Sequence, residues 1–501
     1  METLNLIRPE LLTFSSDQIR TLWPYLIVFV GAVFTIIGSV LNGKSSKWLV
    51  FLVTVATCGA GIFHSAELMR DSSLVLFNGM MISDAYSHFF NVIFLGVTLL
   101  TAFASFRYLD HEQLQHPEYF VLLLFSALGM MLMVSSLDLI VVFIALELMS
   151  LCVYALVGFR RNDRKSNEAA MKYFILGSAA SAVFLYGVAL LYGSTGSTEV
   201  TRIYELVQEN FALQTPVYTL GLVLVLFGFL FKVAAVPLHM WMPDVYEGAP
   251  TPITGFMTTG LKAAAFAIFL RVLITLGYGK GLADYLQSHI HDLLWVFAAL
   301  TMLVGNVVAL TQTNIKRMLA YSSIAHTGYL LVGIVAGVRG ELGFYPVIAY
   351  LLSYAVMNLG AFVVLTILGQ RGDVGLNLHD LSGISARHPW LSFCMAVFLF
   401  SMAGIPPTAG FAAKYMLLYS AVQAGEIPLV IIAVLCSAIS VYYYLRVLVY
   451  MYMREPAESP TQLRVSLWSQ FALVSMVVLT LQIGILPGKV IHLAKKAIMS
   501  I

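Results

Sequence analysis

The chain has 501 residues, of which 59% are hydrophobic and only 11% are charged. Soluble globular proteins carry about 25% charged residues, so this composition excludes an ordinary water-soluble fold. The formal net charge of +2 is too small to indicate nucleic acid or an acidic partner.

Long apolar stretches recur along most of the chain, each close to the roughly 20 residues with which a helix crosses a bilayer. We therefore predict an all-α, polytopic membrane protein with about 14 transmembrane helices. The predicted spans are 22–41, 47–66, 83–108, 118–136, 138–158, 169–193, 216–244, 252–276, 291–311, 316–337, 343–369, 389–421, 427–453 and 466–487.

The first residues, METLNLIRPELLTF, contain no long apolar core. We expect no cleavable signal, so the first span should stay in the membrane. Lys and Arg are concentrated in the loops after odd-numbered spans, as in the RRNDRK loop at 160–165, although the two tails add basic residues to the other side. The positive-inside tendency therefore predicts that this loop is cytoplasmic and that both termini lie outside.

Two predicted spans are unusually long and contain prolines. Span 216–244 is interrupted near Pro237, and span 389–421 is interrupted at Pro406 and Pro407. A helix breaks at membrane depth only where protein or a polar cavity satisfies the freed backbone groups. If spans 4–8 and 9–13 form two units of five, the broken helix is the fourth member of each unit, and the second unit is inverted.

Inverted repeats with broken helices at matching positions are typical of transporters, where the breaks form ion sites. This interpretation divides the chain into four parts. They are an N-terminal three-helix segment (1–117), a first five-helix repeat (118–276), a second, inverted five-helix repeat (277–453) and a C-terminal span (454–501).

Four ionisable side chains lie near the middle of predicted spans: Glu147, Lys232, Lys262 and Lys414. Such a residue costs about 2.5–3.5 kcal/mol on insertion scales. Any one of them could be a bundle-facing residue that pairs with a neighbour. Four of them across both halves favour a functional role, because Ser, Thr or Asn would hold helices together at lower cost.

Proton transfer is the chemistry that suits these groups. Burial disfavours the charge of a lysine and a nearby carboxylate restores it, so Lys232 beside Glu147 would hold a proton until the two separate. Lys262 would then be the next acceptor, and Lys414 would exchange protons with one aqueous side. This assignment requires water or polar groups between the lysines.

Two histidines are candidate relays, because histidine titrates near neutral pH. His326 follows Ser322 and Ser323 by about one turn in the tenth span, and we favour a relay role for it. His239 follows Pro237 closely, and a satisfied buried histidine explains it equally well. Bundle packing and a water path explain three other polar residues equally well: Tyr350, Tyr354 and Asn358.

Cofactor motifs are missing from the sequence. The cysteines lie in apolar segments without metal-binding spacing, and the HIH at 289–291 has no third ligand nearby. We find no phosphate-binding glycine loop. We therefore expect no cofactor and no metal in this chain.

Three long motifs carry a resemblance to a known family: KVAAVPLHMWMPDVYEGAPTPITGF (232–256), NIKRMLAYSSIAHTGY (314–329) and YLLSYAVMNLGAF (350–362). They resemble the antiporter-like membrane subunits of respiratory complex I, which are related to Mrp cation/proton antiporter subunits. The resemblance covers nearly all of 118–453. VYEGAPTP, TTGLKAAAF and a lysine in the twelfth span look like the N-type of these subunits, whereas the M-type carries glutamate there and the L-type has a long C-terminal lateral helix.

The resemblance implies a role for each candidate. The family's glutamate of the fifth span falls on Glu147, and its lysines of the seventh, eighth and twelfth spans fall on Lys232, Lys262 and Lys414. It implies a subunit of a proton-translocating NADH:quinone oxidoreductase in the bacterial inner membrane. The expected partners are other membrane-arm subunits, and NADH, FMN, iron–sulfur clusters and quinone are expected in partner subunits.

Three alternatives remain open at this point. A subunit of a multisubunit Na⁺/H⁺ antiporter would use the same residues without a redox partner, and the genomic neighbourhood would separate it from complex I. A non-pumping membrane scaffold would lose assembly together with activity when Lys232 is replaced. A photosynthetic complex fed by ferredoxin would differ only in the electron donor, which binds elsewhere.

Overall fold

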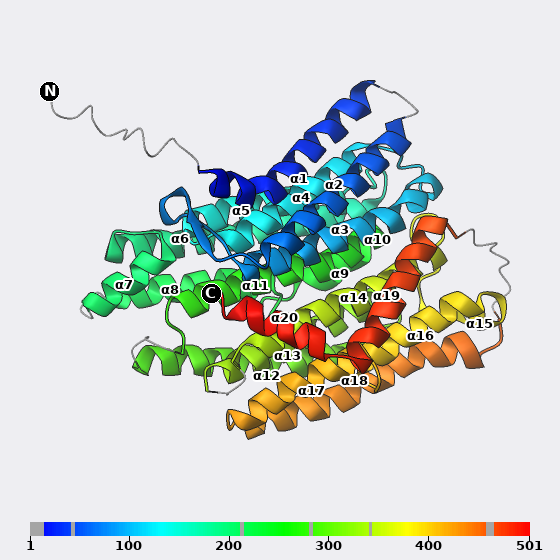
Figure 1. Cartoon of the computed structure of the whole chain (residues 1–501). Coiled ribbons are helices and arrows are strands. Elements are labelled where there is room, and N and C mark those ends of the chain that lie inside the picture. The colour runs from blue at the N-terminus through cyan, green and yellow to red at the C-terminus, as the bar shows by residue number, and fades with distance from the viewer. Residues whose placement is uncertain (1–14, 42–45, 211–214, 280–283, 340–342, 457–464) are drawn as a thin grey trace.

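A computed structural model describes residues 15–41, 46–210, 215–279, 284–339, 343–456 and 465–501. Its helices form one bundle (Figure 1). Helices α1 (Ser16–Leu41) and α2 (Ser46–Leu68) form one edge of this bundle, and α17 (Ala409–Gln423) and α18 (Ile427–Met453) form the opposite edge.

Within the described residues, 12 helices are long and apolar enough to cross a membrane. Besides α1, α2 and α18, they are α3 (Ala85–His111), α4 (Glu118–Ser135), α5 (Leu139–Val157), α6 (Arg164–Thr195), α10 to α11 (Thr251–Thr275), α12 (Asp284–Thr311), α13 (Ile315–Gly337), α14 (Tyr345–Leu368) and α19 (Leu467–Ile485). The predicted all-α, polytopic class is confirmed. The count of 14, the inverted repeats and the four-part division stay predictions.

Two shorter apolar helices, α8 (Pro216–Lys232) and α16 (Pro389–Ala403), begin the two spans that were predicted to be broken. The second halves of those spans are α9 (Trp241–Gly248) and α17. Proline supplies no N–H to continue a helix, so the breaks fall where the sequence places Pro237 and Pro406.

The break after α8 is satisfied by side chains of three other helices. Thr327 Oγ1 of α13 donates to Val233 O (2.8 Å), Trp241 Nε1 of α9 donates to Phe231 O (3.2 Å), and Val236 N donates to Thr301 Oγ1 of α12 (2.9 Å). Unbonded backbone groups inside a membrane would cost several kcal/mol each, so these contacts stabilise the open turn.

The break between α16 and α17 is held by close backbone packing. Gly404 ends α16 with φ +89°, a left-handed conformation that favours glycine. Gly410 N donates to Ser401 Oγ (3.0 Å), and a Cβ at Gly410 would lie 1.8 Å from Ser401 O. Only glycine therefore fits where the two half-helices cross.

One helix departs from the sequence prediction. A continuous helix was expected over 252–276, but a π-helical turn, η5 (Met257–Leu261), separates α10 (Thr251–Phe256) from α11 (Lys262–Thr275). Such turns inside helices occur frequently at functional sites. The turn ends directly before Lys262. It contains Gly260 but no proline, and it was not predicted from the sequence.

Several short elements were also not predicted. They are the hairpin β1 (Leu74–Leu76) and β2 (Met81–Ser83) with the 3-10 turn η3 (Phe77–Gly79), the helices α7 (Val200–Glu209), α15 (Ile384–Arg387) and α20 (Gly488–Ile498), and the 3-10 turn η6 (Leu378–Leu381). Helix α20 crosses the bundle obliquely and packs on α3 and α14 (Figure 1).

The centre of the bundle consists of α10 to α11, α13 and α14, which are buried almost throughout. Helices α1, α6 and α18 instead expose apolar faces, as expected for helices at a lipid or subunit boundary. The polar residues of the central helices are therefore enclosed by protein on all sides.

Candidate proton-transfer site

Lys232 lies in the apolar interior at the last position of α8. Its Nζ donates to Ser150 Oγ of α5 at 2.9 Å. Glu147 lies one turn before Ser150, but no ion pair within 4.0 Å joins Glu147 and Lys232 in the described part of the chain. Glu147 Oε1 is buried without a hydrogen-bond partner there. Ser150 thus occupies the place beside Lys232 that the sequence suggested for Glu147.

Lys262 begins α11 directly after the π-helical turn and is buried. Its Nζ donates to the carbonyl oxygen of Ser323 on α13 (2.6 Å) and also to the Ser323 hydroxyl. The Tyr354 hydroxyl donates to Ser323 Oγ at 2.9 Å, and Asn358 Nδ2 donates to the Tyr354 hydroxyl. A hydrogen-bonded chain therefore links α11, α13 and α14.

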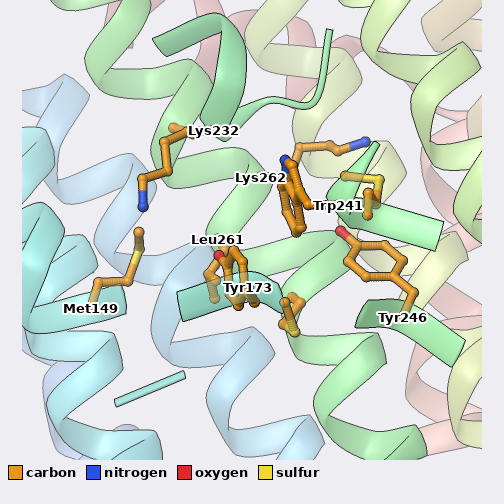
Figure 2. Close-up of a pocket in the computed structure, with 10 residues that line it drawn as sticks. Met149, Tyr173, Lys232, Trp241, Tyr246, Leu261 and Lys262 are labelled. Atoms are coloured by element: carbon orange, nitrogen blue, oxygen red, sulfur yellow. The ribbon is translucent and has the colours of Figure 1, made fainter. Parts of the chain in front are cut away.

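A cavity of about 10 Å³ lies between Lys232 and Lys262. Figure 2 shows both lysines at this cavity, with the Lys232 amine directed toward Met149. A cavity needs a volume of about 10–15 Å³ to hold a water molecule, so this cavity is at the lower limit for one water. The other lining residues are Tyr173, Trp241, Met242, Tyr246, Met257, Leu261 and Ala265.

His326 of α13 is fully enclosed, and both of its ring nitrogens face hydroxyl groups. Nδ1 lies 2.6 Å from the Tyr350 hydroxyl, and Nε2 lies 3.2 Å from the Tyr444 hydroxyl of α18. The Tyr444 hydroxyl also bonds Ser322. Because a hydroxyl can donate or accept, either tautomer of His326 satisfies this geometry.

Lys414 of α17 reaches back to the end of α16. Its Nζ donates to Met402 O (2.9 Å), Ala403 O (3.2 Å) and Ser437 Oγ (3.1 Å). The Tyr329 ring lies near both Lys414 and His326, with 5.1 Å from the lysine Nζ to the ring centre and 5.8 Å between the two ring centres.

The two lysines at the broken helices share one electrostatic feature. Lys232 is the last residue of α8, and Lys414 bonds the last two carbonyls of α16. The C-terminal end of a helix carries partial negative charge, which stabilises a cation by about 0.3–1 kcal/mol and by more in a partly buried site. The break after α16 therefore places partial negative charge directly beside the Lys414 amine.

The structure does not bring His239 into this arrangement. Its side chain is half-buried, and no hydrogen bond or ion pair joins it to the lysines or His326 in the described residues. Its relay role stays a prediction. Sequence reasoning missed Ser150, Ser437 and Tyr444, because single Ser and Tyr residues in apolar helices carry no distinguishing signal.

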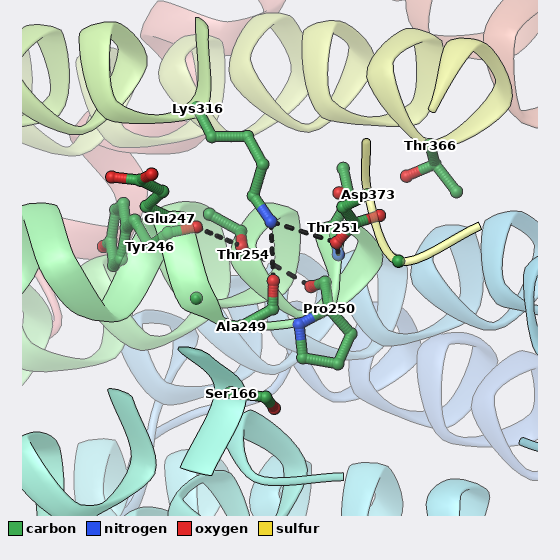
Figure 3. Close-up of polar contacts among 12 residues, drawn as sticks. Ser166, Tyr246, Glu247, Ala249, Pro250, Thr251, Thr254, Lys316, Thr366 and Asp373 are labelled. Atoms are coloured by element: carbon green, nitrogen blue, oxygen red, sulfur yellow. Dashed lines mark hydrogen bonds and ion pairs between the residues drawn. The ribbon is translucent and has the colours of Figure 1, made fainter. Parts of the chain in front are cut away.

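Charged residues also meet at one end of the bundle. Arg160 and Lys316 lie 3.2 Å and 3.1 Å from Asp373 Oδ2, and Thr251 N donates to the same oxygen at 3.1 Å. Figure 3 shows Lys316 reaching both Asp373 and Ala249 O, the latter at 2.6 Å. We call Arg160, Lys316 and Asp373 the ion triad.

The ion triad is nearly closed to water, with side-chain exposures of 7%, 1% and 5%. Burial by itself would raise the pKa of the Asp373 carboxyl, but Lys316 and Arg160 outweigh burial and hold this pKa below its ordinary value. Asp373 therefore remains ionised at neutral pH and compensates two buried cations.

A helical membrane bundle with two broken helices and buried lysines at both breaks defines the class of antiporter-like membrane subunits. The family model described as "NADH:quinone oxidoreductase/Mrp antiporter, TM" matches residues 136–440. The chain belongs to this family.

Similar proteins agree with the resemblance to N-type subunits. NADH-quinone oxidoreductase subunit N of Trichlorobacter lovleyi is 43% identical over 486 residues, covering 97% of this chain and 98% of that protein. Subunit N 2 of Rhizobium meliloti is 42% identical over 478 residues, covering 95% and 96%. The predicted resemblance is confirmed.

Solved structures show the same fold. A chain of respiratory complex I from Thermus thermophilus is 33% identical with a TM-score of 0.78, covering 94% of this chain and 98% of that chain. A chain of the Mrp complex from a Dietzia species is 21% identical with a TM-score of 0.83, covering 96% and 97%. The latter likeness concerns the fold alone.

Proposed function

We propose that this chain is an N-type, proton-translocating membrane subunit of an NADH:quinone oxidoreductase. The observation that carries the proposal is the polar row, which we define as Glu147, Lys232, Lys262, His326 and Lys414. Its members come from α5, α8, α11, α13 and α17 and cross the enclosed centre of the bundle. Intramembrane ionisable groups in such an arrangement mark proton relays.

The geometry suggests how the row handles protons. In the structure described here, the Lys232 amine donates a hydrogen bond to Ser150, and Glu147 forms no ion pair with Lys232. Approach of Glu147 would favour the charged lysine, and withdrawal would favour transfer toward Lys262 through water in the intervening cavity. The proton would then pass along Ser323, Tyr354 and His326 toward Lys414. The last transfer, from His326 to Lys414, would require the Tyr329 side chain to move.

Redox chemistry belongs to other subunits in this proposal. NADH, FMN, iron–sulfur clusters and quinone would bind to partner subunits, and this chain would contribute translocation. Relatives named as subunits of NADH-quinone oxidoreductase reach 43% identity, whereas the Mrp likeness stays at 21%. This difference favours the oxidoreductase over an Na⁺/H⁺ antiporter.

The proposed location is the bacterial inner membrane, with both termini outside and neighbouring membrane-arm subunits as partners. The proposed division is a three-helix segment (1–117), two inverted repeats (118–276 and 277–453) and a C-terminal span (454–501). Positions of the two breaks support the repeats, because each follows a first half-helix of similar length, α8 and α16.

Reconstituted complex with Lys232→Ala or Glu147→Gln tests the proposal. We expect normal assembly, little NADH oxidation and proton pumping reduced about tenfold or more, because a positioned proton-transfer group contributes 10²–10⁴-fold. The control is Lys165→Gln, which alters an exposed ion pair outside the row. Normal pumping by an assembled Lys232→Ala complex would refute the proposal. Joint loss of assembly and activity would indicate a scaffold.

A further inference from the structure

A groove of about 470 Å³ lies between α4, α5 and α6, outside the polar row. Sites for small molecules typically measure about 300–1,000 Å³. Its walls are mainly apolar and include Leu122, Tyr154, Ala155, Phe159, Met171 and Phe174. The proposed function uses none of these side chains.

Two opposite charges line the mouth of this groove. Glu118 is the first residue of α4, and Arg161 lies in the loop between α5 and α6. Both are exposed, and neither forms an ion pair within the described residues. The neighbouring Arg160 and Lys165, in contrast, are paired with Asp373 and Glu247.

The loop that carries Arg161 is held in place. Asn167 Nδ2, at the rim of the groove, donates to Arg161 O at 2.8 Å. The groove continues from the charged mouth past Leu122, about one turn inside α4, and past Phe174, about three turns inside α6. It therefore begins at the water-facing helix ends and continues along the apolar region.

We propose that the groove binds a phospholipid whose headgroup carries both a phosphate and a primary ammonium, as phosphatidylethanolamine does. Arg161 binds the phosphate through its planar guanidinium, and Glu118 accepts hydrogen bonds from the ammonium. An acyl chain lies along Leu122, Ala155 and Phe174. One zwitterionic lipid satisfies both unpaired charges and the apolar walls together, which is why we assign a lipid and not a helix of a partner protein.

The test uses the intact complex in nanodiscs of equal parts phosphatidylethanolamine and phosphatidylglycerol. After extraction in mild detergent, mass spectrometry measures the lipid retained. Arg161→Gln should reduce retained phosphatidylethanolamine about tenfold, since a charge-assisted contact of this kind is lost. Glu118→Gln should remove the preference for phosphatidylethanolamine over phosphatidylglycerol. Arg164→Gln, which alters an exposed cation at the start of α6 outside the groove, should change neither.

A second variant tests the groove itself without changing charge. Ala155 is exposed at the wall, so Ala155→Phe should fill the groove and reduce retention as strongly as Arg161→Gln, without lowering thermal stability. Unchanged retention in both variants would overturn the proposal, as would equal loss in Arg164→Gln. A benzophenone amino acid in place of Ala155 that crosslinks to a protein subunit, and not to lipid, would overturn it too.

Discussion

Each buried lysine of the polar row donates to neutral oxygens. Lys232 bonds Ser150, Lys262 bonds Ser323, and Lys414 bonds Ser437 and backbone carbonyls, and none has a carboxylate within 4.0 Å among the described residues. A hydrogen bond that involves a charged group contributes about 1.5–3 kcal/mol. No carboxylate therefore fixes any of these three lysines in the charged state among the described residues.

Ser150 offers a test at the scale of one residue. Ser150→Ala removes the acceptor of the Lys232 amine, whereas Ser150→Thr keeps a hydroxyl. We expect the alanine variant to assemble and to lose about tenfold in proton pumping by reconstituted complex, since loss of a charged hydrogen bond costs about 1.5–3 kcal/mol. The threonine variant should keep most of the activity. If both variants pumped protons as fast as the unchanged complex, Ser150 would have no part in proton transfer.

At the scale of elements, the broken helices need close packing as well as proline. Gly410 lies against Ser401 O at the crossing of α16 and α17, next to the carbonyls that bind Lys414. Overpacking of a tight site typically costs about 1–3 kcal/mol. A side chain at Gly410 must move α16, and the carbonyls of Met402 and Ala403 must move with it.

Gly410→Ala should therefore lower both the unfolding temperature and proton pumping. Its matched control is Gly193→Ala in α6, where no atom lies within 4 Å of the added Cβ. That variant should leave pumping unchanged and stabilise the helix by about 1 kcal/mol. Thermal unfolding in detergent and pumping in proteoliposomes measure the two effects. Identical behaviour of the two variants would contradict the packing argument.

At the scale of the whole molecule, the ion triad joins segments that are far apart in sequence. Arg160 follows α5, Lys316 belongs to α13, and Asp373 follows α14. Asp373 also bonds Tyr108 of α3 at 3.2 Å and the first residue of α10. One carboxylate therefore holds together five parts of the bundle, including helices that carry the polar row.

Asp373→Asn should destabilise the fold by about 3–5 kcal/mol, because it leaves the buried Lys316 without a counter-charge and leaves Arg160 with Asp163 alone. The comparison is Glu205→Gln, which breaks the exposed Arg202–Glu205 pair and should cost about 0–1 kcal/mol. Thermal unfolding of the purified chain compares the two. An Asp373→Asn variant as stable as Glu205→Gln would contradict the role of the ion triad.

The same residue predicts how stability depends on pH. Because its pKa is lowered in the folded state, the contribution of Asp373 is fully present above the ordinary pKa of an aspartate and is lost as pH falls through the lowered value. Unfolding temperature should therefore be insensitive to this group between about pH 5 and pH 8 and fall in stronger acid. Asp373→Asn should abolish the fall in unfolding temperature that protonation of Asp373 causes in acid.

Much of this protein was predictable because the bilayer imposes simple rules. Apolar length predicted the spans, proline predicted the breaks near Pro237 and Pro406, and the cost of buried charge singled out Glu147 and the three lysines. The π-helical turn before Lys262 was not predicted, because Thr and Gly are common where membrane helices pack together and do not by themselves specify such a turn. The short amphipathic helices α7 and α20 fell below the length expected for spans.

The sequence by itself determined which residues are out of place in an apolar environment, because that depends only on residue type and on the length of the surrounding apolar stretch. Only the tertiary structure decided their partners. Lys232 bonds Ser150 and not Glu147, and Lys414 bonds the end of α16. Hydrogen bonds extend about 3 Å and depend on how helices distant in sequence pack together, which no local pattern encodes.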